Sequence, residues 1–317
     1  KEGVILVEET VVKDLIIEDN KVVGVRTELE EYYSDITVLA DGVNSLLALK
    51  AGLRNRIEPQ DVALSVKEVI KLPEDVINER FGVQSDEGCI YEIFGGSMLE
   101  MLGLGFLYTN KNSVSIGLGV TLSELIKREI RPYDLLDKLK EHPQIAPLIK
   151  DGELLEYSAH LIPEGGYKKI PKLTDNGVMI CGDAAMFVNN MHWEGTNLAM
   201  ISGKLAGETA VIALGKQDYS KNVLEHYEEE LEQSFIIKDL RTYRNLMGVI
   251  EDREKEFLGY YPKKINEFFK MFTTVDSVPK RENYRRFIKS IFTDRKISEL
   301  FKDFWAVMKL LWSILIK

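Results

Sequence analysis

Two stretches of the sequence place an acidic residue beside a glycine directly after an apolar run of strand length. Asp41-Gly42 follows the β-branched run 36–39, and Gly182-Asp183 joins the apolar run 178–181. Each pattern is typical of a buried strand that ends in a tight turn and leads into a helix. Asp41-Gly42 taken by itself fits an ordinary turn equally well.

A helix is predicted directly after the second turn, from Gly195-Thr196-Asn197 onward. Its small residues would let a neighbour pack very close: Ala199, Ser202, Gly203, Ala206, Gly207 and Ala210. The free N–H groups and positive dipole end of such a helix suit a phosphate or an electron-rich ring. The sequence therefore predicts a nucleotide cofactor site, the alternative being a packed strand, turn and helix without a ligand.

Length and cysteine content restrict the class of protein. A chain of 317 residues that is 45% hydrophobic can bury a large core in two domains or one elaborate domain. Cys89 and Cys181 are too few for a disulfide framework, a zinc site or a cluster held by four thiolates, so we expect no metal on this chain. The first residues, Lys1 to Val4, fit a strand and contain no Met, so we expect the numbering to open inside a domain.

The net charge of −10 is unevenly distributed. Residues 262–317 carry 13 Lys and Arg against 6 Asp and Glu, which makes this segment +7 and the remainder −17. The acidic body argues against nucleic acid as a partner. The basic, aromatic-rich tail suits an anionic membrane surface or an acidic protein.

Residues 59–162 fit an open antiparallel sheet with a hairpin turn at Asn110 to Asn112, followed by short helices. This block separates the two acidic turns, which is typical of an inserted substrate domain. Gly103 and Gly105 lie inside one of its strands and indicate either a bulge or close approach by a ligand. Residues 157–167 are too irregular for one element and fit a crossover. His160 and His192 have no neighbours at a spacing that predicts a triad or a metal site.

The chain beyond Gly215 is predicted to be helical throughout. In residues 297–317 the apolar and aromatic side chains fall on one helix face, while Lys302, Asp303 and Lys309 fall mostly opposite. The lysines interrupt the apolar run, so we do not expect a transmembrane span. The pattern fits a helix lying in a membrane interface, or one docked on its own protein or on a subunit.

Several motifs together make the chain resemble the family of FixC and electron-transfer-flavoprotein:quinone oxidoreductases (ETF-QO), which are FAD proteins. The resemblance is closest over residues 1–208. The motifs are Thr37-Val38-Leu39-Ala40-Asp41-Gly42-Val43-Asn44-Ser45, Val66-Lys67-Glu68, Glu156-Tyr157-Ser158-Ala159-His160-Leu161-Ile162-Pro163-Glu164-Gly165-Gly166, Gly182-Asp183-Ala184-Ala185 and Glu194-Gly195-Thr196-Asn197-Leu198-Ala199-Met200.

The resemblance implies an α/β fold with an FAD-binding, glutathione-reductase-like domain in two parts, 1–58 and 163–215. It also implies an inserted quinone-binding domain, 59–162, and a helical region, 216–317.

The family's cofactor residues carry over to matching positions. Gly182-Asp183 would approach the pyrophosphate and bind the ribityl chain, and Gly195, Thr196 and Asn197 would face the pyrimidine end of the flavin. The turn Asp41-Gly42 and the strand at Val11 would contact the adenosine part, and Gly103 and Gly105 would lie near the quinone pocket. No side chain is expected to act as a catalytic acid or base.

Two departures from the family pattern affect this interpretation. The N-terminal G-x-G-x-x-G fingerprint is absent, so we expect a fragment or a partner chain that supplies the missing half of the FAD domain. The cysteine ligands of a four-iron cluster are also absent. This favours the FixC form, in which a separate small ferredoxin-like subunit carries the iron-sulfur cluster.

The expected function is therefore transfer of electrons from electron-transfer flavoprotein subunits to a quinone, on the cytoplasmic side of a membrane. Two alternatives remain open. One is a geranylgeranyl-lipid reductase with the same fold. The other is a non-catalytic assembly subunit with a vestigial flavin fold.

Overall fold

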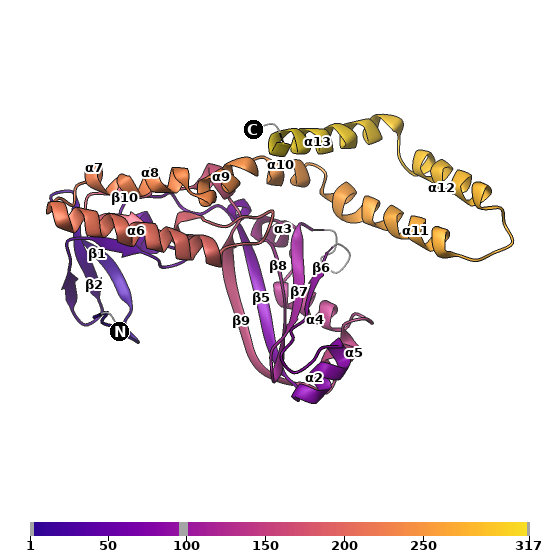
Figure 1. The fold of residues 1–317 in the computed structure, drawn as a ribbon, viewed down its shortest axis with the longest axis horizontal. Coiled ribbons are helices and arrows are strands. Elements are labelled where there is room, and N and C mark those ends of the chain that lie inside the picture. Colours follow the sequence, from indigo (N-terminus) through magenta and orange to yellow (C-terminus); the bar gives the residue numbers. More distant parts are fainter. Residues whose placement is uncertain (1–2, 95–100, 316–317) are drawn as a thin grey trace. The chain divides into compact units, whose positions relative to one another are not determined.

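The computed structural model describes residues 3–94 and 101–315 (Figure 1). The chain forms two compact units. Unit 1 comprises Lys1–Val62 and Leu161–Arg244, and unit 2 comprises Ala63–His160 and Asn245–Lys317. The terminal residues 1–2 and 316–317, which the sequence assigns to a strand and a helix, lie outside the described residues.

The first sheet of unit 1 is antiparallel and consists of β1 (Val12–Glu18), β2 (Lys21–Thr27) and β3 (Glu31–Tyr33). Asp19 and Asn20 join β1 to β2 with φ angles of 48° and 62°. Two successive left-handed residues give a hairpin turn whose twist matches that of paired strands, and Asp and Asn adopt this conformation more readily than most residues.

The segment before β1 departs from the prediction. Residues 4–11 form no strand, and Val4, Ile5 and Leu6 are more than three-quarters exposed. A strand needs a hydrogen-bonded neighbour, and no described strand pairs with this segment. The expectation of a strand from the first residues is therefore wrong for the described part of this segment.

The second sheet of unit 1 has the order β10 (Thr174–Asp175), β11 (Val178–Ile180) and β4 (Thr37–Leu39). β11 runs antiparallel to β10 and parallel to β4. All three residues of β11 are at most 1% exposed. A strand buried on both faces has a continuous apolar sequence, which is why the run 178–181 predicted it.

The 3-10 helix η4 (Gly182–Ala185) follows β11, and the long helix α6 (Thr196–Lys216) follows η4. Gly182 packs closely on α6, because a Cβ at Gly182 would lie 3.2 Å from the Cβ of Ala199. The Gly182 N–H donates to the Ser202 hydroxyl at 3.0 Å, and that hydroxyl donates to the Ala199 carbonyl at 3.1 Å. The close packing predicted for the small residues of this helix is confirmed at Ala199, which contacts Gly182.

Shorter helices complete unit 1, and α8 runs beside α6 (Figure 1). Tyr227 of α8 is fully buried and donates its hydroxyl proton to the Ile180 carbonyl at the end of β11, at 2.9 Å. The remaining elements are α1 (Leu46–Lys50), η1 (Pro59–Asp61), η3 (Gly166–Lys169), α7 (Lys221–Leu224), α8 (His226–Gln233) and α9 (Phe235–Thr242).

Unit 2 contains a five-stranded sheet whose described pairings are antiparallel, as predicted. The Asn110 N–H donates to the Ser113 carbonyl at 2.8 Å and closes the predicted hairpin. In sheet order the strands are β6 (Ile90–Ile93), β7 (Gly103–Thr109), β8 (Ser113–Thr121), β5 (Val62–Lys71) and β9 (Glu153–Pro163).

The edge strand β9 contradicts the prediction of a crossover for residues 157–163. Most of its eleven residues are exposed, on both faces of the sheet. An edge strand that is exposed on both faces needs no alternation of polar and apolar residues, so its sequence lacks the pattern on which strand prediction depends.

Short helices follow strand β8 of this sheet along the chain, as predicted. The helices of this part of unit 2 are α2 (Glu74–Phe81), α3 (Leu122–Lys127), α4 (Pro132–Lys140) and α5 (Ala146–Ile149). Helix α2 was missed, although Pro73 stands at its start and Gly82, with a φ of 65°, ends it.

The C-terminal part of unit 2 is helical, as predicted. Helices α11 and α12 form an antiparallel pair, because Lys264 near the start of α11 contacts Asp294 at the end of α12 at 2.7 Å. The elements are α10 (Leu246–Glu251), the π-helix η5 (Lys255–Tyr260), α11 (Tyr261–Thr273), α12 (Lys280–Asp294) and α13 (Ile297–Leu315).

The packing of Gly182 generates a prediction about stability. Gly182→Ala should lower the free energy of unfolding by roughly 1–2 kcal/mol, because its φ of 62° is left-handed and the added methyl group meets Ala199. The matched control is Gly207→Ala in α6, where a Cβ meets nothing within 4 Å. The control should raise stability by roughly 0.5–1 kcal/mol. Equal midpoints of denaturant unfolding for the two variants would contradict this account.

Candidate functional site

The two acidic turns predicted from the sequence lie side by side. They follow β4 and β11, which are adjacent and parallel, with Leu39 opposite Ile180. The Cys181 N–H donates to the Leu39 carbonyl at 3.0 Å just before the second turn. The carboxyl ends of adjacent parallel strands are where open α/β sheets bind their ligands.

The first turn is Asp41-Gly42. Gly42 has a φ of 76°, and a Cβ there would meet no atom within 4 Å, so open space lies beside it. The Ser45 hydroxyl donates to Oδ1 of Asp41 at 2.7 Å, while Asp41 itself is exposed. The turn therefore presents an oriented carboxylate next to accessible backbone.

The second turn presents Asp183, whose side chain is half-buried. Among the described residues its carboxylate has no hydrogen-bond or ion-pair partner, although its backbone carbonyl accepts from the Met186 N–H. Burial raises the pKa of Asp183 above its ordinary value. A partly buried carboxylate without a partner costs free energy that hydrogen bonds from a ligand can offset.

The amino end of α6 lies beside Asp183. A Cβ at Gly195 would be 3.9 Å from Oδ1 of Asp183, and Thr196 and Asn197 are exposed. No side chain caps this helix, so its first N–H groups have no partner from within the helix. The structure thus brings together six of the predicted residues: Asp41, Gly42, Gly182, Asp183, Gly195 and Thr196, with Asn197 adjoining them.

Sequence reasoning missed Arg54, which joins the two turns. Its Nη1 donates to the Val43 carbonyl at 2.8 Å and to the Ala184 carbonyl at 3.4 Å. Burial lowers the pKa of Arg54, and the charge of Asp41 opposes that effect. Its acceptors are backbone carbonyls, which every residue has, so no sequence pattern marks this contact.

The other predicted site residues lie elsewhere. Val11 is exposed and lies just before β1 rather than in a strand. Strand packing explains why residue 103 of β7 is a glycine, because a Cβ there would lie 2.4 Å from the Gly119 carbonyl oxygen of β8. Gly105 is buried in the same strand, opposite Leu118 of β8. Their assignment to a substrate pocket stays a prediction.

The histidines and cysteines form no recognisable catalytic group. His160 is exposed on β9, and Nε2 of His192 lies 3.1 Å from the Tyr243 hydroxyl. Cys181 is buried, which raises the pKa of its thiol, and Cys89 is partly exposed. Within residues 3–94 and 101–315, no three His, Cys, Asp or Glu side chains are placed to hold a metal ion.

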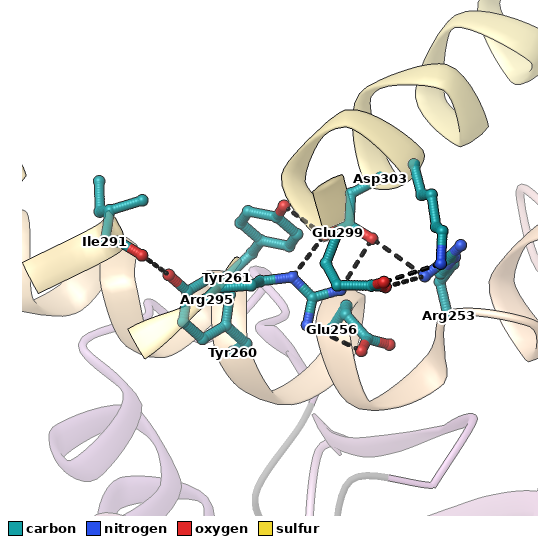
Figure 2. Close-up of polar contacts among 9 residues, drawn as sticks. Arg253, Glu256, Tyr260, Tyr261, Ile291, Arg295, Glu299 and Asp303 are labelled. Carbon is teal, nitrogen blue, oxygen red and sulfur yellow. Dashed lines mark hydrogen bonds and ion pairs between the residues drawn. The ribbon is translucent and has the colours of Figure 1, made fainter. Parts of the chain in front are cut away.

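A second feature with functional implications is the way α13 docks in unit 2. Asp303 is 2% exposed and lies within a group of polar residues that we call the Asp303 cluster (Figure 2). Its members are Arg253, Glu256, Tyr261, Arg295, Glu299 and Asp303.

Asp303 is the centre of this cluster. Arg295 binds it through two parallel contacts, Nε–Oδ2 at 2.8 Å and Nη2–Oδ1 at 3.0 Å, and the Tyr261 hydroxyl donates to Oδ2 at 2.7 Å. Figure 2 shows these side chains converging on α13 from the preceding helical segments. The pKa of Tyr261 is raised, mainly by burial and secondly by its hydrogen bond to the Asp303 carboxylate. The side of α13 that carries Glu299 and Asp303 therefore faces the protein, while Lys302 and Lys309 are exposed.

The apolar side of α13 is consequently exposed. We define the outer face of α13 as its apolar residues that are at least 42% exposed: Ile297, Phe301, Phe304, Trp305, Leu311, Trp312 and Leu315. More than half of each of Phe269 and Phe272 on α11, and of Ile288 and Phe292 on α12, is also exposed. By length and composition only α6, among the described helices, could cross a membrane, and it contributes buried residues to the core of unit 1.

Two family models match the chain. The model described as ETF-QO, ubiquinone-binding, matches residues 63–162, and that of the ETF-QO/FixC family C-terminal domain matches residues 246–312.

Solved structures with a similar fold include a geranylgeranyl bacteriochlorophyll reductase-like protein from Thermoplasma acidophilum. Its TM-score is 0.65 at 18% identity, over 95% of this chain and 69% of its own. The flavin-dependent brominase Bmp2 gives a TM-score of 0.54 at 18% identity, over 90% of this chain and 71% of its own. At this identity the likeness shows the fold alone.

Three relatives establish the family. Protein FixC of Bradyrhizobium diazoefficiens is 43% identical over 95% of this chain and 70% of its own length. Protein FixC of Azotobacter vinelandii is 41% identical over 93% and 70%. A probable electron transfer flavoprotein-quinone oxidoreductase of Escherichia coli is 38% identical over 84% and 62%. The chain therefore belongs to the ETF-QO/FixC family of flavin-dependent oxidoreductases.

Proposed function

We propose that this chain is a FixC-like subunit that binds FAD and passes electrons from an electron-transfer flavoprotein to a membrane quinone. One observation carries the proposal. Two turns with acidic residues and the uncapped amino end of α6 meet at the carboxyl ends of β4 and β11. The match of residues 63–162 to a ubiquinone-binding domain supports the quinone as acceptor.

The described residues fit FAD. Its diphosphate needs backbone N–H donors and space for close approach. Open space lies beside Gly42 at the first turn, and the uncapped amino end of α6 supplies N–H groups without a partner from within the helix. The ribityl hydroxyls of FAD need hydrogen-bond acceptors. The Asp183 carboxylate can accept such bonds, because no described residue donates a hydrogen bond to it.

When bound, FAD would accept electrons from one protein partner and deliver them to a quinone. Asp183 would accept a hydrogen bond from the ribityl chain and so orient the cofactor. The N–H groups of residues 195–197 and the α6 dipole would stabilise negative charge on the pyrimidine end of the ring. No acid or base among the side chains is needed for this role.

The proposed function also implies a division of the chain into domains. We infer a glutathione-reductase-like FAD domain from residues 1–58 and 163–215, with Val11 near the adenine. The inserted domain, 59–162, would hold the quinone near Gly103 and Gly105. Residues 216–317 would form the C-terminal region.

The partners follow from electron flow and from cysteine content. Electron-transfer flavoprotein subunits would supply electrons. A small ferredoxin-like subunit would carry the iron-sulfur cluster, because the two cysteines of this sequence cannot supply four thiolate ligands. The protein would be peripheral on the cytoplasmic side of the membrane. Its outer face of α13 would lie in the interface, where Trp and Phe are favourable and where Lys302 and Lys309 meet anionic lipid.

The proposed activity is tested with the purified full-length protein. We expect a yellow protein that reduces a quinone when reduced electron-transfer flavoprotein is supplied. Hydrogenation of a polyprenyl lipid in place of quinone reduction would favour a geranylgeranyl-lipid reductase, whose fold is similar. A colourless protein that gains no flavin absorbance with added FAD would indicate an assembly subunit.

Asp183→Asn tests the role of the half-buried carboxylate. It should weaken FAD binding about tenfold, which corresponds to about 1.4 kcal/mol, measured by flavin titration of the apoprotein. Burial raises the pKa of Asp183, so the folded apoprotein holds this proton more tightly than the unfolded chain does. Stability from this group is therefore lost as pH rises from the ordinary carboxyl range through the raised pKa.

The apo form of Asp183→Asn should consequently be more stable than the wild-type apo form above that pH window, and the difference should vanish below it. Denaturant unfolding between pH 4 and pH 8 measures this. Asp218→Asn is the control. A backbone hydrogen bond from Ser220 lowers the pKa of Asp218, so this variant should be less stable than the wild type at high pH. If the wild-type apoprotein were more stable than Asp183→Asn at pH 8, the ionised Asp183 carboxylate would not be unfavourable in the folded protein, and this account would be refuted.

The membrane role is tested by replacing three exposed aromatic residues of α13. Phe301→Ser, Trp305→Ser and Trp312→Ser together should reduce binding to phosphatidylglycerol vesicles by more than tenfold, since each buried aromatic side chain contributes roughly 1.5–3 kcal/mol. The matched control replaces the exposed apolar residues Leu29, Leu154 and Leu155 by Ser. Vesicle sedimentation that is unchanged by the aromatic replacements, or by deletion of 297–317, would rule out this surface.

A further inference from the structure

Charge at the candidate cofactor site is unbalanced. Residues 37–49 and 178–203, which contain both turns and the start of α6, include no Lys or Arg. They do include Asp41, Asp183 and Glu194. A bound diphosphate would add further negative charge. Arg54 is the cation that the described interactions bring to both turns.

Arg54 is only partly used by the contacts within the protein. Nη1 alone makes both hydrogen bonds, to Val43 and to Ala184. Among the described residues Nε and Nη2 have no partner, and no carboxylate forms an ion pair with the guanidinium. A guanidinium has five N–H donors in a planar fork that matches the oxygens of a phosphate group. A half-buried cation with unused donors is unfavourable until an anion joins it.

We propose that Arg54 binds the diphosphate of FAD through the N–H groups of Nε and Nη2, while its Nη1 ties the two turns together. The proposal rests on the proposed function, because it requires that the turns hold FAD. It adds a specific phosphate contact at a residue that no sequence motif marks. Arg54 would also fix the spacing of the carbonyls of Val43 and Ala184, so the two turns would be held in register for the cofactor.

The experiment compares three variants of the full-length protein by calorimetric titration of the apo form with FAD, ADP and riboflavin. ADP carries a diphosphate without a flavin, and riboflavin carries a flavin without a phosphate. Arg54→Met should weaken binding of FAD and of ADP at least tenfold and weaken riboflavin binding by a much smaller factor, because riboflavin has no phosphate for the guanidinium to bind. Arg54→Lys keeps the positive charge but lacks the planar set of N–H donors. Its affinity for FAD and ADP should lie between those of the wild type and Arg54→Met. Arg56→Met, which removes an exposed arginine two residues away, should bind like the wild type.

Thermal unfolding of the apo variants separates a phosphate contact from a purely structural role. If Arg54 only ties the turns, Arg54→Met should lower the melting temperature and weaken FAD and riboflavin equally, which would overturn the proposal. Unchanged binding of FAD and ADP would overturn it as well. A wild-type protein that binds no FAD contradicts the proposed function itself, whereas failure confined to Arg54→Met concerns only this residue.

Discussion

The parallel pairing of β4 with β11 is the constraint on which the candidate site depends. Each strand has three residues, so the pairing alone is weak. Backbone hydrogen bonds extend it at both ends, from Thr37 to the Gly177 carbonyl and from Cys181 to the Leu39 carbonyl. The hydroxyl of Tyr227 holds the Ile180 carbonyl from the side of α8. If the register between β4 and β11 shifted by one residue, one turn would move about 3.3 Å relative to the other. The side chains of the shifted strand would then point to the opposite face of the sheet.

Local features of this arrangement were predictable from the sequence, and its long-range features were not. The strand 178–180, the turn at Gly182 and the helix from Thr196 were predicted because their signals lie in consecutive residues. That β4 lies beside β11 follows only from family resemblance or from the structure, since an entire inserted sheet separates the two strands. Arg54 could not be found at all, because backbone carbonyls carry no residue identity.

The orientation of α13 shows a second limit of pattern reading. Helical periodicity predicted an amphipathic helix, and the usual rule places its apolar side against the protein. The structure departs from this rule, because Asp303 is buried while Trp305 and Trp312 are exposed. A buried carboxylate is costly unless it is paired, and here Arg295 and Tyr261 provide the pairing from other segments. Orientation was therefore decided by partners that the sequence of α13 does not contain.

Both features depart from the rules that govern protein interiors and surfaces. Half-buried polar groups usually find partners within the chain, and large apolar side chains usually avoid water. The carboxylate of Asp183, the unused donors of Arg54 and the uncapped end of α6 break the first rule at the end of one small sheet. The outer face of α13 breaks the second. Folding alone explains neither departure, because each costs free energy in the isolated chain, whereas an anionic cofactor and a lipid interface would each recover that cost.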